Sequence, residues 1–117
     1  MGASVQLDLD RIAKLQGLLG ADLGEIVTSL IASMNDQIDL AQRALASGRL
    51  QDVTQPAHRC RNDALMVGAQ PLLTALTALE AASRDGRLRA AQEAAAQLRA
   101  VWPKTREQLE RAAAGSP

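Results

Sequence analysis

Apolar residues recur at every third or fourth position along most of the chain, a period that predicts amphipathic helices rather than strands. The segment 7–20 shows this period and ends at Gly20, which predicts a short opening helix. A longer helix is expected to follow, because Asp22 and Glu25 have the spacing of a capping box and Gly48 suits a left-handed stop. Its apolar stripe consists of Leu23, Ile26, Val27, Leu30, Met34, Ile38, Ala41 and Leu45.

Two helices are expected in the middle of the chain, each bounded by glycine or proline. The first runs from about Arg49 to Val67 and ends at Gly68. The second begins at Pro71, because proline is favoured in the first turn of a helix, and it ends before Gly86. The face of this second helix that is expected to be buried carries Leu72, Leu73, Leu76 and Leu79.

A last helix is expected from about Leu88 to Ala113, with a kink at Pro103. Four amphipathic helices joined by short turns predict an all-α fold, an antiparallel four-helix bundle with a short additional N-terminal helix. Residues 1–117 are interpreted as one domain, whose ends at 1–6 and 112–117 are expected to be frayed. The inward residues of the last helix are expected to be Leu98, either Val101 or Trp102, Thr105 and Leu109.

The composition supports packed helices and narrows the function. Apolar residues make up 47% of the chain and Trp102 is the only aromatic one, so the core is aliphatic, as suits helices. Thirteen basic and thirteen acidic side chains cancel, so no net field would attract nucleic acid. No apolar run approaches the length of a membrane span and no signal peptide is recognisable, which predicts a cytoplasmic protein without membrane contact. One cysteine and one histidine provide neither an internal disulfide nor a set of metal ligands.

The third expected helix places the chain's only histidine on the outside of the bundle. With 100° per residue and His58 at zero, one apolar stripe lies between about 180° and 260°. His58 lies well away from that stripe, with Arg61, Asn62 and Leu65 around it. Cys60 lies within the stripe and is expected to be a small core residue. The stripe is formed by Val53, Ala57, Cys60, Ala64 and Val67.

His58 is the candidate for chemistry. A lone histidine on a helix is most often an incidental side chain, but this one combines a neutral nucleophile with the fixed cation of Arg61 and the apolar Leu65. Such a patch suits a phosphoryl group, because the guanidinium would stabilise the charged product. In the following helix Glu80 falls within the leucine face and needs a partner. Two partners are open: the Nδ1–H of His58, which would leave Nε2 unprotonated, or Arg84 one turn on.

The order of these residues resembles the histidine-containing phosphotransfer (HPt) domain. "AH" at positions 57–58 is followed by a basic residue three positions after the histidine, by "GA" at 68–69 and by "LE" at 79–80. The stretches "GADL", "ALASGRLQDV" and "ALEAASRDGRL" extend the likeness over the whole chain. The resemblance implies that His58 is the phosphoacceptor and that Arg61 stabilises the phosphate in place of the family's lysine. It also implies that Glu80 orients the imidazole and that Gly68 is the structural glycine of the turn.

The resemblance implies a phosphocarrier rather than an enzyme. HPt domains exchange a phosphoryl group with aspartates of receiver domains, in response regulators or hybrid histidine kinases, within two-component phosphorelays. The Mg²⁺ for this transfer is expected on the receiver, so no cofactor and no metal are expected on this chain. Arg59, Asn62 and Leu65 are expected to form the surface that docks the receiver, and the protein is expected to be a monomer.

Departures from the family pattern leave other interpretations open. Asn62 stands where the family prefers glycine and Asp63 where it has serine or alanine, which favours a non-transferring relative that docks a receiver or kinase as a regulator. A purely structural helical interaction module is a third possibility. Pro56 is costly in mid-helix, which suggests that Thr54 caps a helix beginning there. A hydrolase is disfavoured, because the side chain of Cys60 is expected to point into the core.

Overall fold

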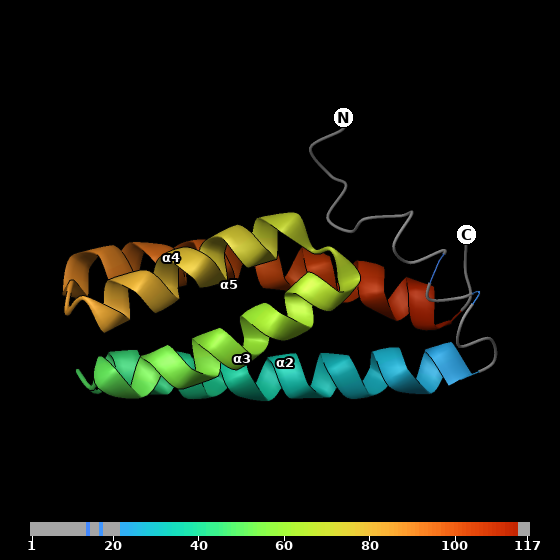
Figure 1. Cartoon of the computed structure of the whole chain (residues 1–117), viewed down its shortest axis with the longest axis horizontal. Helices are drawn as coiled ribbons and strands as arrows, with labels where there is room; N and C mark the ends of the chain where they lie inside the picture. Colours follow the sequence, from blue (N-terminus) through green and yellow to red (C-terminus); the bar gives the residue numbers. More distant parts are fainter. Residues whose placement is uncertain (1–13, 15–16, 18–21, 115–117) are drawn as a thin grey trace.

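The computed structural model describes residues 14, 17 and 22–114, and that part of the chain folds into four helices without a strand (Figure 1). The all-α prediction is confirmed. The expected opening helix over 7–20 lies outside the described residues, apart from positions 14 and 17. Across the same described residues, no helix combines the length and the apolar character that a membrane span requires. The helices are α2 (Leu23–Ala46), α3 (Gln51–Val67), α4 (Gln70–Arg84) and α5 (Leu88–Ala113).

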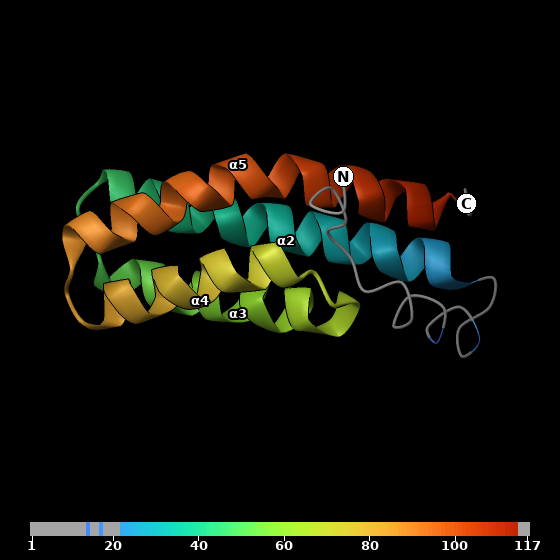
Figure 2. The same ribbon diagram turned by 90° about the horizontal axis from the view of Figure 1, so that it is seen from above.

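The four helices alternate in direction, so that each runs antiparallel to the one before it (Figure 1). Helix α3 packs against α2 on one side and against α4 on the other, and α5 closes the bundle between α4 and α2. Seen from above, α4 lies over α3 (Figure 2), and the two helices pack against each other. Residues on facing sides of α3 and α4 can therefore meet, although they are about twenty positions apart in the sequence.

The core is aliphatic, and its composition follows the predicted stripes with a few shifts. All five residues predicted for the inner face of α3 are buried. In α2, Ile31 and Ala44 take buried positions that the prediction gave to neighbouring residues, because the true helical period moves the stripe slightly around the helix. In α5, Trp102 rather than Val101 is the buried alternative, and its indole N–H donates to Asn35 Oδ1 at 3.2 Å. Ile26, Leu30 and Leu45 are only partly buried.

The helix ends confirm the glycines predicted to end helices, whereas two predicted N-terminal caps are wrong. Gly48 (φ 74°) and Gly68 (φ 66°) both adopt the left-handed conformation in which a side chain is disfavoured. Asp22 does not form the predicted capping box: its backbone is helical, and its side chain makes no capping hydrogen bond. Thr54 is not a cap either, because α3 already begins at Gln51 and continues through Pro56.

Two further prolines of the described residues, Pro71 and Pro103, also lie within helices. Pro71 stands in the first turn of α4, where a missing N–H costs nothing. Pro103 lies inside α5, next to the buried Trp102. Helix α5 runs without interruption to Ala113.

Candidate functional site

The imidazole of His58 projects from α3 at the boundary with α4. Its side chain is 47% exposed, whereas the neighbouring core residues Ala57 and Cys60 have no exposed surface. The outward direction predicted for His58 is therefore confirmed. Partial exposure leaves one side of the ring accessible and turns the other side toward α4.

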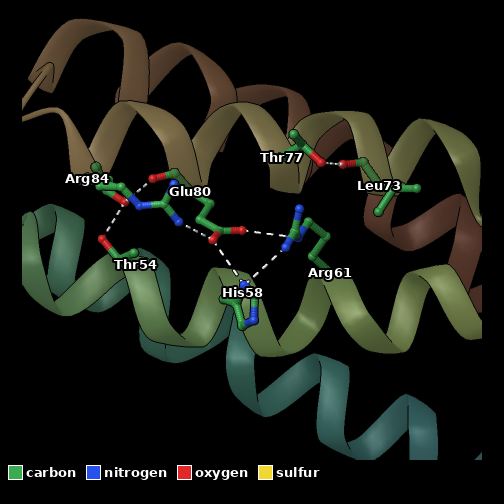
Figure 3. Close-up of polar contacts among 8 residues, drawn as sticks. Thr54, His58, Arg61, Leu73, Thr77, Glu80 and Arg84 are labelled. Atoms are coloured by element: carbon green, nitrogen blue, oxygen red, sulfur yellow. Dashed lines mark hydrogen bonds and ion pairs between the residues drawn. The ribbon is translucent and has the colours of Figure 1, made fainter.

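Glu80 of α4 provides the carboxylate on that buried side. It is 4% exposed and lies between the buried Leu79 and Ala82 of the leucine face. Its Oε2 lies 3.0 Å from His58 Nδ1 (Figure 3). The same oxygen accepts a hydrogen bond from Arg84 Nη2 at 2.5 Å. Both partners considered for Glu80 are thus present, because one carboxylate oxygen has lone pairs for two donors.

Arg61 completes the site from the next turn of α3. Its Nη2 lies 3.2 Å from His58 Nδ1, and its Nε lies 3.1 Å from Glu80 Oε1. The second contact is an ion pair without the geometry of a hydrogen bond, so these two buried atoms make no hydrogen bond. One imidazole and two guanidinium groups therefore surround a single buried carboxylate.

The contacts at Nδ1 decide the position of the imidazole proton. A carboxylate can only accept and a guanidinium can only donate, so Nδ1 cannot hydrogen-bond both Glu80 and Arg61 at once. A proton on Nδ1 satisfies the buried charge of Glu80, whereas its absence would set two lone pairs against each other. The Nδ1–H tautomer is therefore favoured, with Nε2 unprotonated on the side of the ring away from Glu80 (Figure 3).

A second polar link joins α3 and α4 one turn from His58. The hydroxyl of Ser83 donates to the carbonyl of Glu80 at 2.9 Å. Because that bond uses its only proton, Ser83 Oγ must accept from the hydroxyl of Thr54, at 2.8 Å. Ser83 is buried and Thr54 is partly buried, so this hydrogen bond is partly shielded from water and helps to fix the register of the two helices at the site.

The surface around His58 contains the residues predicted for docking. Arg59 and Asn62 are exposed, and Leu65 is 52% exposed. Asp63 points away from His58, because its Oδ2 accepts from the Ser33 hydroxyl of α2 at 3.0 Å. Beyond Leu65, Met66 is also half exposed and borders an open groove of about 470 Å³, lined by Glu25, Ile26, Ser29, Leu30, Ser33 and Met66.

The surroundings of Cys60 keep its thiol protonated. Burial, and to a smaller extent the nearby carboxylate of Asp63, together raise the pKa of its thiol from 9.0 to about 12. The thiol is therefore neutral at physiological pH and is no candidate for a nucleophile.

Sequence reasoning missed three parts of the site. It did not foresee that Arg84 shares an oxygen of Glu80 with the histidine, although the spacing of four residues was a signal. It treated Thr54 as a cap instead of a partner of Ser83, and it did not include Met66 in the exposed surface. The pairing of Thr54 with Ser83 joins two helices and carries no periodic signal in the sequence. The exposure of Met66 could have been read from it, because Met66 lies about 80° from His58 on the helical wheel, outside the buried stripe.

Comparison with known proteins gives one match. The family model of the Hpt domain matches residues 25–115, which include all of α3, α4 and α5 and most of α2. The chain matches no curated protein and no solved structure. The matched residues contain His58, Arg61, Glu80 and Arg84.

Proposed function

Because the chain belongs to the Hpt domain family, whose members transfer phosphoryl groups in two-component phosphorelays, we propose that His58 accepts a phosphoryl group from one receiver aspartate and passes it to another. The observation that carries this proposal is the contact of 3.0 Å between His58 Nδ1 and the buried Glu80. It supports a ring whose Nε2 is both unprotonated and accessible. An exposed histidine without such a partner would have no fixed tautomer.

The chemical step follows from that tautomer. The lone pair of Nε2 attacks the phosphorus of an aspartyl phosphate, and the N–P bond forms while the P–O bond to the aspartate breaks. The electron pair of the broken bond leaves with the aspartate carboxylate. The proton stays on Nδ1, so the ring becomes cationic, and the negative charge of Glu80 balances it. Return of the phosphoryl group to an aspartate reverses these changes.

Arg61 is proposed to stabilise the phosphoryl group on His58. Its guanidinium lies one turn from the imidazole on the same helix, and its side chain is one-third exposed. A planar guanidinium can donate two hydrogen bonds to phosphoryl oxygens at once. This role replaces that of the lysine found at the corresponding position in the family.

The partners on this proposal are receiver domains of response regulators or hybrid histidine kinases. They would dock on Arg59, Asn62 and Leu65, and the exposed Met66 extends this surface toward α2. The Mg²⁺ that supports the reaction belongs to the receiver, and the chain itself acts as a phosphocarrier without a cofactor. We propose that it does so in the cytoplasm as a monomer.

The test is transfer of labelled phosphate from a phosphorylated receiver. Wild-type protein is expected to acquire an acid-labile label, and a His58→Gln variant of unchanged thermal stability is expected to acquire none. Equal labelling of both proteins would overturn the proposal, because no other histidine is present in the chain.

Asn62 favours a second candidate function, a regulator that docks a receiver without taking its phosphate. The exposed side chain of Asn62 lies one turn from His58, where the family pattern has glycine. Receiver binding that is unaffected by His58→Ala, together with absence of label on the wild type, would decide for this function.

A further inference from the structure

Two arginines contact the carboxylate of Glu80, although one cation would balance its single negative charge. Arg61 of α3 faces Oε1, and Arg84 of α4 donates to Oε2, the oxygen that also contacts His58 Nδ1. The two arginines differ in the quality of these contacts. Arg84 makes a hydrogen bond to the carboxylate, whereas the contact of Arg61 Nε with Oε1 lacks hydrogen-bond geometry.

Arg61 and Glu80 compete for the same ring nitrogen. The Nη2 of Arg61 lies 3.2 Å from Nδ1, close enough to donate to it if Nδ1 carried no proton. That arrangement would place the proton on Nε2 and block the nucleophile. The position of Glu80 Oε2 therefore decides which tautomer exists, since Oε2 alone accepts from a protonated Nδ1.

Arg84 is placed to hold Glu80 in contact with the ring nitrogen. It lies one turn after Glu80 on the same helix, and its side chain donates to Glu80 Oε2 (Figure 3). We infer that Arg84 is a positioning residue, which holds Oε2 of Glu80 on Nδ1 of His58 and thereby keeps Nε2 unprotonated. This inference deepens the proposed function, and it rests on that function only for the need of an unprotonated Nε2.

The same arrangement separates the tasks of the two arginines. When Arg61 turns toward a phosphoryl group on Nε2, Glu80 loses its contact on Oε1. A buried carboxylate without a cation is strongly disfavoured, and Arg84 remains to provide one. The link between Thr54 and Ser83 supports Arg84 in this task, because it fixes the turn of α4 from which Glu80 and Arg84 project.

The tautomer of His58 can be measured without any phosphoryl donor. His58 is the only histidine, so the ¹⁵N shifts of the imidazole need no assignment. At about pH 8.5, where an ordinary imidazole is neutral, the wild type is expected to show mainly the Nδ1–H form. Arg84→Gln is expected to lower the ratio of Nδ1–H to Nε2–H roughly threefold or more, because a charge-assisted hydrogen bond is lost. Arg84→Lys should restore part of that ratio.

Two further variants separate positioning from a general loss of charge. Arg61→Gln removes the competitor and should leave the ratio unchanged or raise it. Arg111→Gln is the matched control, because it also removes an ion pair between an arginine and a carboxylate four residues away. Arg111 lies 2.5 Å from Glu107, and both side chains are exposed and far from His58 in the sequence. This control should keep the wild-type ratio.

The outcomes separate the inference from the proposed function. The role assigned to Arg84 would be overturned if folded Arg84→Gln kept the wild-type ratio of Nδ1–H to Nε2–H. It would also be overturned if Arg61→Gln lowered this ratio more than Arg84→Gln does. If Arg84→Gln shifts the tautomer while wild-type protein takes no phosphate from a receiver, the positioning role stands and the proposed function fails. Thermal unfolding of each variant identifies any protein that has lost its fold.

Discussion

The imidazole of His58 has one side exposed to solvent and the other in contact with the buried carboxylate of Glu80. The position of His58 relative to the buried stripe follows from the turn angle alone, and the structure confirms it. The spacing of Glu80 and Arg84 also indicated their contact, because residues four apart are neighbours on a helix. The approach of Glu80 to His58 remained one of two alternatives, since it depends on how two helices pack.

The two unusual residues after Arg61 have different surroundings. Asp63 is held by Ser33 and directed toward α2, so it does not add its charge to the space above His58. Asn62 is exposed on the outer face. Of the two departures from the family pattern, only Asn62 therefore lies where a receiver would approach.

Shortening Asn62 is expected to speed phosphoryl transfer. Asn62→Ala and Asn62→Gly both remove a side chain from the docking surface, so each should raise the transfer rate from a phosphorylated receiver several-fold. Only the glycine variant should be less stable than the wild type, by about 0.5 kcal/mol, because glycine disfavours the helix. Rapid-quench kinetics gives the rates, and wild-type rates in both variants would show that Asn62 does not obstruct the partner.

Cys60 is expected to make stability depend on alkaline pH. The pKa of the folded thiol is raised to about 12 from 9.0, so above pH 9 only the unfolded chain releases this proton. This contribution to the free energy of unfolding is complete below pH 9 and is lost as the pH rises toward the pKa of the folded thiol, with a loss of roughly 1 kcal/mol at pH 10. Urea unfolding, followed by the fluorescence of the single Trp102, should show this loss in wild type relative to Cys60→Ala. Parallel pH profiles would contradict the prediction.

Helix α3 shows where local rules and tertiary packing disagree. A proline in its second turn removes the amide hydrogen that would bond the carbonyl of Asp52, and this led to the prediction of a later helix start. The helix nevertheless begins at Gln51. The burial of Val53 in the core and the hydroxyl contact of Thr54 with Ser83 of α4 hold this turn in the bundle.

Replacement of Pro56 is expected to stabilise the protein. Pro56→Ala restores the missing hydrogen bond, and after the greater entropy of the unfolded chain is subtracted the gain should be about 2 kcal/mol. Pro71→Ala is the matched control, because a first-turn proline lacks only an N–H that needs no partner, so no gain is expected. Urea denaturation followed by circular dichroism compares the two. No gain in Pro56→Ala would mean that the first turns of α3 already accommodate the ring.

The arrangement of the whole bundle determines which surface can meet a partner. Helices α2 and α4 flank α3, and α5 lies diagonally across the bundle from it (Figure 2). The outer face of α3, with His58 and the half-exposed Leu65, is therefore separated from the outer face of α5 by the core. An exposed leucine on α5 provides an internal comparison for any binding measurement.

Leu65 is expected to contribute to receiver binding, and Leu88 is not. Leu65→Ala should weaken the affinity for a cognate receiver about tenfold, or about 1.4 kcal/mol, as expected for an apolar side chain near the centre of an interface. Leu88, which is 46% exposed at the start of α5, is the matched control and its alanine variant should bind normally. Isothermal titration calorimetry measures both affinities. An equal loss in the two variants would place the docking surface elsewhere.

The sequence by itself determined the helices, their inward faces and the outward direction of His58, because periodicity and glycine stops act within a few residues. It also carried the family pattern. Only the tertiary structure decided that Glu80 of α4 contacts both His58 and Arg61 of α3, and that Thr54 pairs with Ser83. These contacts depend on the register of α3 against α4, which core packing sets and which neither helix encodes alone.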